Sequence, residues 1–210
     1  GEKGIYQNDE SKILNIRTGL DVKFSKLLKA GVQTVISARN NDATASRVNK
    51  AYGVAPVGMP YNEDGSVRLR PLGETNATIS PIANYAPGVY IDNSKNLNIN
   101  VYPYVEFTPI NNLTVRSNLG ISASLARNGF FQSERAYNPA SEGKVTKEAS
   151  YSTAIGQSYI WENYATYNFD INDLHQFTAT GIISMGKSIG ETSAIAVNGL
   201  DFDYYTYYNT

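Results

Sequence analysis

Glu106 and Glu162 are the residues to weigh first as catalytic groups, because a pair of carboxyl groups is the machinery of glycoside hydrolysis. That reaction needs two carboxyl groups about 5 to 10 Å apart, one of them with a raised pKa. The spacing of the two residues does not place them together, so we expect both on solvated strand faces. The single histidine, His175, begins a predicted strand beside a turn and has no candidate partners for a metal site. We therefore predict that the chain is not an enzyme.

Two short polar segments, 62–65 (Asn-Glu-Asp-Gly) and 92–96 (Asp-Asn-Ser-Lys-Asn), share residue types with calcium-binding loops. Both lack the required spacing of oxygen ligands, which ends in a glutamate at the twelfth position. The first segment is better interpreted as a turn in which Gly65 has a positive φ, joining two short strands within a loop. We expect no metal and no cofactor.

The composition favours strands and turns over long helices. The 210 residues include 16 Tyr, 22 Asn and 17 Gly, and Tyr suits a pleated surface while Asn and Gly suit turns. Lys and Arg total 18 against 19 Asp and Glu, a net charge of -1, whereas a nucleic-acid module needs an excess of cations to bind phosphates. Cysteine is absent, so disulfides and thiolate metal sites are excluded. No partner among nucleic acids is expected.

Strict alternation of apolar and polar residues predicts an all-β fold of about six long antiparallel, up-and-down strands in three hairpins. The clearest stretch is 14–24, where Leu14, Ile16 and Leu20 alternate with polar residues. Short turns are expected within the hairpins, and long loops between them. Pro103 cannot donate to a strand ladder and is unusual in a central strand. The expected organisation is hairpin 12–39, long loop 40–96, hairpin 97–125, loop 126–157, hairpin 158–186, and a loop or further strand over 187–210.

Short turns at one end and long loops at the other match the requirements of a transmembrane barrel. Eleven tilted residues span about 25 Å, the height of the apolar band of such a barrel. Six strands cannot close, since the smallest barrels have eight, so this interpretation makes the chain part of a larger protein. The alternative is a soluble all-β carbohydrate-binding or adhesion module, in which the apolar faces pack sheet against sheet.

Three stretches resemble the barrel of SusC-like (RagA-type) TonB-dependent outer-membrane transporters of Bacteroidetes: 61–73 (YNEDGSVRLRPLG), 98–121 (NINVYPYVEFTPINNLTVRSNLGI) and 161–181 (WENYATYNFDINDLHQFTATG). The opening Gly4-Ile5-Tyr6 and the hairpin 14–38 are similar too. The resemblance implies part of a 22-stranded barrel with a plugged lumen. It also implies import of oligosaccharides or oligopeptides in the outer membrane, energised through TonB and assisted by a SusD-like surface lipoprotein. The plug domain that would contact TonB is absent from this sequence.

Aromatic and charged residues on the polar strand faces and in the first long loop are the candidate ligand contacts under this interpretation. Tyrosine offers a rigid ring that stacks on sugars and a polar hydroxyl group. The alternative is that membrane barrels carry tyrosines at both interfaces in any case. The closing segment 201–208 is expected to be a girdle strand, with a ligand-binding surface as the alternative. The predicted ligand-binding residues are Tyr85, Tyr90, Tyr102, Tyr104, Glu106, Arg116 and Glu162.

Overall fold

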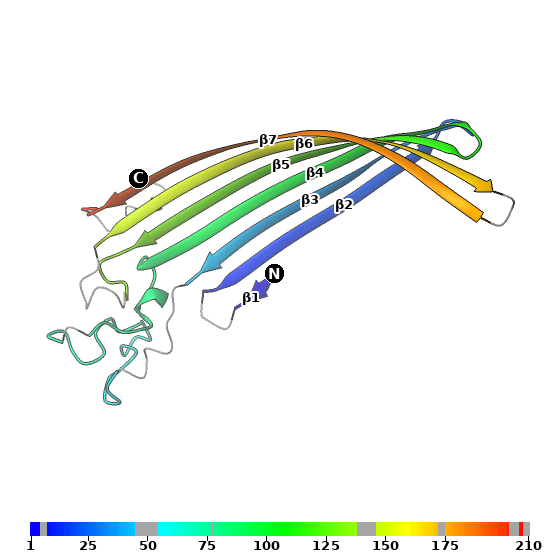
Figure 1. Cartoon of the computed structure of the whole chain (residues 1–210). Helices are drawn as coiled ribbons and strands as arrows, with labels where there is room; N and C mark the ends of the chain where they lie inside the picture. The colour runs from blue at the N-terminus through cyan, green and yellow to red at the C-terminus, as the bar shows by residue number, and fades with distance from the viewer. Residues whose placement is uncertain are drawn as a thin grey trace.

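A computed structural model describes residues 1–4, 8–44, 54–76, 78–137, 146–171, 175–201 and 206–207. These residues form one antiparallel sheet in which seven strands lie in sequence order (Figure 1). The prediction of an all-β, up-and-down fold with six long strands is confirmed. The strands are β1 (Glu2–Lys3), β2 (Glu10–Lys23), β3 (Leu28–Ala43), β4 (Tyr90–Ile110), β5 (Leu113–Gln132), β6 (Glu148–Ile171) and β7 (His175–Asn198).

The strands run further toward the loop end than the alternation predicts. β4 begins at Tyr90, inside the expected loop 40–96, and β5 continues to Gln132. β7 continues to Asn198, past the expected end of the third hairpin. These extensions are rich in Asn, Ser, Gly and Ala, so their apolar alternation is weak, although their backbones pair in the same ladders. The turn residues 172–174 and most of the segment 201–208 lie outside the described residues.

One face of the sheet is apolar and lies against nothing in the described structure. The register places Val101 beside Thr34 on β3 and Ile121 on β5, and Ile121 in turn beside Tyr159 on β6. Leu20 is 61% exposed and Trp161 is 42% exposed. A sandwich would bury such side chains against a second sheet, and the described residues form only one. The alternative of a soluble module with sheet packed on sheet is therefore not supported.

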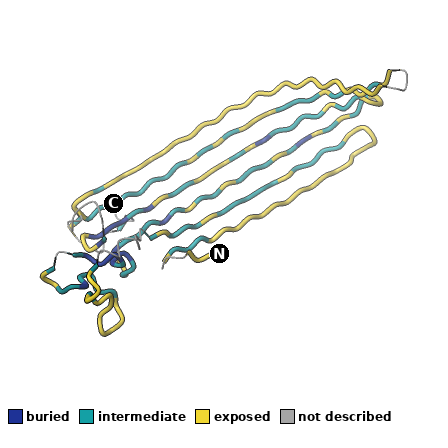
Figure 2. The backbone as a smooth tube through the Cα atoms, turned by 60° about the horizontal axis from the view of Figure 1, so that its bottom comes forward, coloured by how far each residue is buried: buried dark blue, intermediate teal, exposed yellow. Residues whose placement is uncertain are grey.

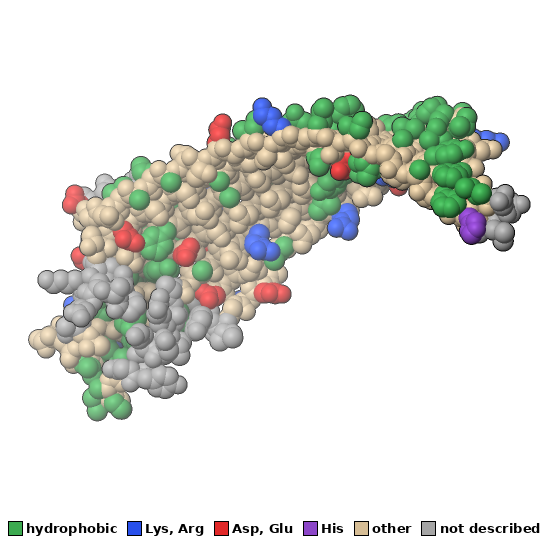
Figure 3. Space-filling view, in the orientation of Figure 1, with side chains coloured by type: hydrophobic (Ala, Val, Ile, Leu, Met, Phe, Trp, Pro, Cys, Tyr) green, Lys and Arg blue, Asp and Glu red, His purple; other side chains and the backbone are tan. Residues whose placement is uncertain are grey.

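The other face is polar. Figure 3 shows a broad surface of backbone and uncharged polar side chains with scattered charges, while hydrophobic side chains gather along its upper edge and at the turn end. Figure 2 shows that exposure is greatest along the two outer long strands. Every residue of β7 except Val197 is exposed, because no other strand among the described residues pairs with its outer edge.

Pro103 interrupts one of the two ladders of β4. It lies opposite Val32 on β3, but neither Pro103 nor Tyr102 has a registered partner on β5. Proline has no N–H to donate, so the hydrogen-bonded pairing lapses on that side and resumes at Tyr104 and Asn118. The strand therefore tolerates proline at the cost of a local gap.

Successive hairpins are offset along the strand direction. The β2–β3 pairing ends at Lys23 and Lys29, whereas β4 continues past that level to Ile110. β6 and β7 continue past the β4–β5 turn, and their last pair is Ile171 and His175. Such a stagger is what strands tilted against a barrel axis require.

A small core lies at the loop end of the sheet. Phe131, Ala149 and Tyr207 are buried together, and Val89 packs with Ala136 beside the short helix η2 (Ala83–Tyr85). Within the long loop, Gly65 has φ of 81° and Tyr61 pairs with Val67, which confirms the predicted turn between two short extended segments. Among the described residues, no helix has the length and hydropathy to cross a membrane.

Candidate ligand-binding site on the polar face

Five of the seven predicted ligand-binding residues lie together on the polar face, near the turn end. The register places Glu106 beside Arg116, and Asn118 beside Glu162, so side chains from β4, β5 and β6 converge. Tyr102, Tyr104, Arg116 and Glu162 help to line a shallow cavity of about 250 Å³. We call the following residues the polar-face cluster: Asp21, Lys29, Tyr102, Tyr104, Glu106, Arg116, Asn118 and Glu162.

Tyr104 is the centre of this cluster and is held from several sides. Its side chain is only 8% exposed, and its hydroxyl group donates a short hydrogen bond to the Asp21 carboxylate on β2. The Arg116 guanidinium lies 4.1 Å from the ring centroid, and the Lys29 ammonium lies 5.4 Å from it. Both distances are within the range of cation–π attraction. Tyr104 therefore stabilises the packing of the polar face and offers little surface to a ligand.

The two glutamates of the cluster have different partners. Arg116 Nη1 lies 3.3 Å from Glu106 Oε2, and Arg116 Nε donates to Asn118 Oδ1 at 2.8 Å. The hydroxyl group of Tyr164 donates to Glu162 Oε2 at 2.9 Å. Glu106 is thus paired with a cation, and Glu162 is hydrogen-bonded to a neutral hydroxyl group. This arrangement can hydrogen-bond and orient a polar ligand.

Tyr102 is the accessible aromatic residue of the cluster. It is 45% exposed, and its ring lies over Gly120, where an added Cβ atom would be 3.6 Å from the nearest ring carbons. Its backbone has no registered partner on β5. Of the two tyrosines predicted on this face, Tyr102 has the surface that a ligand could contact.

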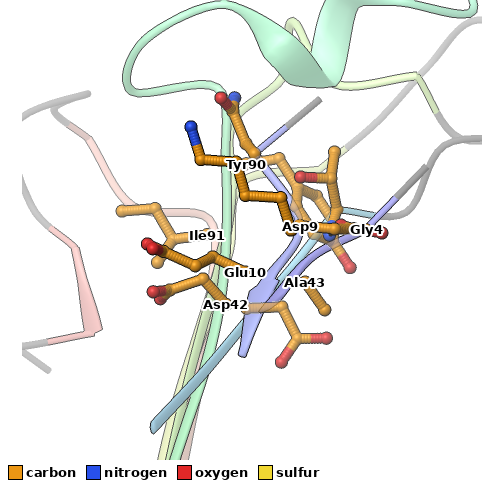
Figure 4. A pocket seen from close by; sticks show the side chains of 11 residues that line it. Gly4, Asp9, Glu10, Asp42, Ala43, Tyr90 and Ile91 are labelled. Carbon is orange, nitrogen blue, oxygen red and sulfur yellow. The ribbon is translucent and has the colours of Figure 1, made fainter. Parts of the chain in front are cut away.

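Tyr90 lies elsewhere, in a pocket of about 750 Å³ at the loop end of the sheet (Figure 4). Asp9, Glu10, Asp42 and Asp92 also line this pocket, which makes it acidic. Tyr90 and Asp92 stand on the loop side of the apolar stretch 97–107. Burial, helped by the nearby charges of Asp92 and Glu148, raises the pKa of Tyr90 to about 12. Burial also raises the pKa of the Asp92 carboxyl.

Hydrogen bonds inside the protein already occupy part of this pocket's lining. Asp9 Oδ1 accepts a bond from the Thr44 amide at 2.6 Å, and Asp42 Oδ1 accepts one from Asn93 Nδ2 at 2.6 Å. No group of three carboxylates or histidines among the described residues is placed to hold a metal ion.

Tyr85, the remaining predicted residue, is in η2 at the loop end of the sheet, apart from the polar-face cluster (Figure 1). Its backbone carbonyl accepts a hydrogen bond from Asn8 Nδ2 at 3.4 Å. The structure therefore separates the predicted residues into a cluster of five near the turn end and two tyrosines near the loop end.

Asp21, Lys29 and Asn118 belong to the site but were not predicted as ligand-binding residues. Asp21 and Lys29 flank the first turn on the polar face, and their pairing across the β2–β3 and β3–β4 ladders brings them to Tyr104. The alternation could have indicated their face. It could not have indicated which position of β4 they meet.

Comparisons with known proteins agree with this fold. No model of a protein family matches the chain. The chain is 23% identical over 188 residues to TonB-dependent receptor P26 of Formosa agariphila, a match that covers 89% of this chain and 18% of the receptor.

Among solved structures, the chain is similar to the RagAB peptide transporter, with a TM-score of 0.68 and 16% identity. It is also similar to the RagAB peptide importer in its "open-open" and "closed-closed" states, with TM-scores of 0.69 and 0.67 and 16% identity in both. Each match covers 93% of this chain and 22% of the other. The chain thus spans about a fifth of the length of these proteins.

These matches confirm the resemblance to SusC-like, RagA-type TonB-dependent transporters. The sheet has the fold of part of such a barrel. The relatives are named as a receptor and as transporters, which is consistent with a protein that is not an enzyme.

Proposed function

We propose that this chain forms part of the wall of a TonB-dependent importer in the outer membrane, with its apolar face toward lipid and its polar face toward the lumen. One observation carries the proposal: a single sheet exposes a continuous apolar face across six long strands, and no other described residues form a layer that covers it. In water such a face would be a severe aggregation hazard, whereas acyl chains solvate it.

The proposed activity is uptake of oligopeptides or oligosaccharides, and the polar-face cluster favours oligopeptides. Arg116, Lys29, Glu106 and Glu162 present charges of both signs, which suit the charged and amide groups of peptides. Tyr102 offers a ring to side chains or sugars. The similarity to proteins described as peptide transporters supports the same choice.

The partners we propose follow from the family resemblance. A SusD-like lipoprotein would meet the loop end of the sheet, where the loop that contains η2 projects beyond β3 and β4 (Figure 1). Coupling to TonB would pass through a plug supplied by the remainder of the protein. Outer-membrane lipid would surround the apolar face.

Deletion of the full-length gene tests this function. Strains are grown with a mixture of oligopeptides, or with the corresponding free amino acids, as the sole nitrogen source. Loss of growth on oligopeptides alone, restored by the intact gene, is the expected result. Equal growth on both sources, together with normal growth on oligosaccharides, would contradict the proposal. An importer of sugars would instead be indicated by loss of growth on oligosaccharides only.

A further inference from the structure

Tyr207, which follows β7, packs back onto the face of the sheet that carries the apolar band. On this face Leu125 of β5 is 47% exposed, whereas Phe131, three side chains further along the same face of the strand, is fully buried. Phe131 shares its buried cluster with Ala149 of β6 and with Tyr207, which is only 4% exposed. The chain beyond β7 therefore turns back and covers this face of β5 and β6 at the loop end.

The Tyr207 ring lies in a seat built from three residues of β5 and β6. It rests against the backbone of Gly129, where an added Cβ atom would overlap three carbon atoms of the ring. The Tyr151 ring stacks on it, with a centroid distance of 6.4 Å and an angle of 12° between the planes. The Arg127 guanidinium lies 5.8 Å from the centroid, within the range of about 6 Å for cation–π attraction. We call Tyr207 together with Arg127, Gly129 and Tyr151 the Tyr207 clasp.

Arg127 connects the clasp to β4 and β3. It donates a short hydrogen bond to Asn93 Oδ1 on β4. Asn93 is only 6% exposed, and its Nδ2 lies within hydrogen-bond distance of three oxygen atoms of β3, the closest of which is Asp42 Oδ1 at 2.6 Å. Asp42 is the second-last residue of β3. A continuous set of contacts therefore runs from the clasp to the place where β3 ends.

We propose that the Tyr207 clasp couples the loop after β7 to the loop after β3, so that release of one loosens the other. The two loops leave the sheet at the same end (Figure 1), but β4, β5 and β6 lie between the strands that they follow. Residues that share one network of hydrogen bonds and ring contacts are coupled in energy, so losing one member weakens the hold on the others. The inference does not depend on what the protein transports.

The test measures hydrogen exchange of two backbone amides in the full-length protein, purified in detergent. The Gly199 amide donates to the Lys147 carbonyl oxygen at 2.8 Å, directly after β7. The Thr44 amide donates to Asp9 Oδ1 at 2.6 Å, directly after β3. Each amide therefore reports on one of the two loops, because its exchange rate depends on how often its hydrogen bond opens.

Two variants release the clasp in different ways. Tyr207→Ala removes the ring, and Gly129→Ala keeps the ring but fills its seat. Both should speed exchange of the Gly199 amide by about tenfold and of the more distant Thr44 amide by about fivefold. Unchanged exchange at Gly199 in both variants would overturn the clasp, and unchanged exchange at Thr44 would overturn the coupling.

Asn93→Ala tests the route, because it removes the link between the clasp and β3. In this background Tyr207→Ala should still speed exchange at Gly199 but should have no further effect at Thr44. An undiminished effect at Thr44 in the double variant would overturn the route through Asn93. The matched control is Tyr159→Ala, which removes a tyrosine on the same face of β6 that is 47% exposed. It should change either amide by less than about twofold, and an effect equal to that of Tyr207→Ala would overturn the inference.

Discussion

Tyr104 lies across Gly31 of the neighbouring strand, so closely that a Cβ atom added at Gly31 would be 2.6 Å from a Tyr104 ring carbon. The same added atom would be 2.7 Å from the backbone carbonyl oxygen of Leu20 and closer still to the Asp21 carboxylate. The glycine is therefore needed for the packing of Tyr104 against β3, and through it for the polar-face cluster.

Gly31→Ala should destabilise the folded barrel by about 1 to 3 kcal/mol, the usual cost of forcing an extra group into a packed site. The measurement is the temperature at which the folded full-length protein unfolds in detergent. Gly181→Ala is the matched control, since Gly181 is also in a strand and an added Cβ atom there would meet nothing within 4 Å. A Gly31→Ala protein as stable as the control would show that Tyr104 can move aside freely.

The two tyrosines of the polar face should respond differently to substitution. Tyr104→Phe removes the hydrogen bond to Asp21 and should cost about 1 to 2 kcal/mol of stability while leaving uptake within about twofold, because the ring is buried. Tyr102→Ala should leave stability nearly unchanged and reduce uptake of the substrate, because its ring is exposed on the polar face. Thermal unfolding and uptake of a labelled peptide separate the two effects. The reverse result would assign ligand contact to Tyr104.

The assignment of faces predicts a sharp contrast between adjacent residues of β4. Val101→Arg places a cation on the apolar face within the stretch 97–107 and should destabilise the barrel by about 2 to 4 kcal/mol. Asn100→Arg places the same side chain on the polar face and should be nearly neutral. The fraction of folded protein recovered in outer membranes measures both variants. Similar recovery of the two would mean that the apolar face does not meet lipid.

The turn at Asp64 should be sensitive to acid. Hydrogen bonds from the Ser66 hydroxyl group and backbone amide to the Asp64 carboxylate, at 2.6 and 2.9 Å, lower the pKa of Asp64 from its ordinary value of 3.8. A lowered pKa means that the carboxylate stabilises the turn above pH 3.8, and that this effect is lost as the pH falls through the folded-state pKa. Hydrogen exchange of the Ser66 amide should therefore show less protection at pH 2.5 than at pH 5.

Asp64→Asn is the control for this effect, because the amide oxygen still accepts the two bonds but does not titrate. Protection of the Ser66 amide that falls equally with pH in Asp64→Asn would show that another group causes the loss.

The sequence was sufficient to predict the strands wherever apolar and polar residues alternate, as from Leu14 to Phe24. It was not sufficient at 90–96 or 126–132, because Asn, Ser and Gly give a strand no apolar face there, and the pairing depends on the ladder of the neighbouring strand. The candidate residues Glu106 and Glu162 were identified individually. Their common location became visible only with the register, since Arg116 and Asn118 of β5 stand between them.

The offset between successive hairpins determines the register in which a further strand can pair with the sheet. β6 and β7 extend beyond the end of β5, and the extra pairs run from Asn168 and Thr178 to Ile171 and His175. A further strand that pairs with the outer edge of β7 must therefore be shifted in the same direction, so that its backbone amides find partners. In a closed barrel built from such strands, the offsets add up around the ring, and the last strand pairs with the first at a position displaced along the strand direction. Removal of a single residue from β6 would turn the side chains of that strand beyond the deletion to the opposite face, so that apolar and polar residues would exchange sides there.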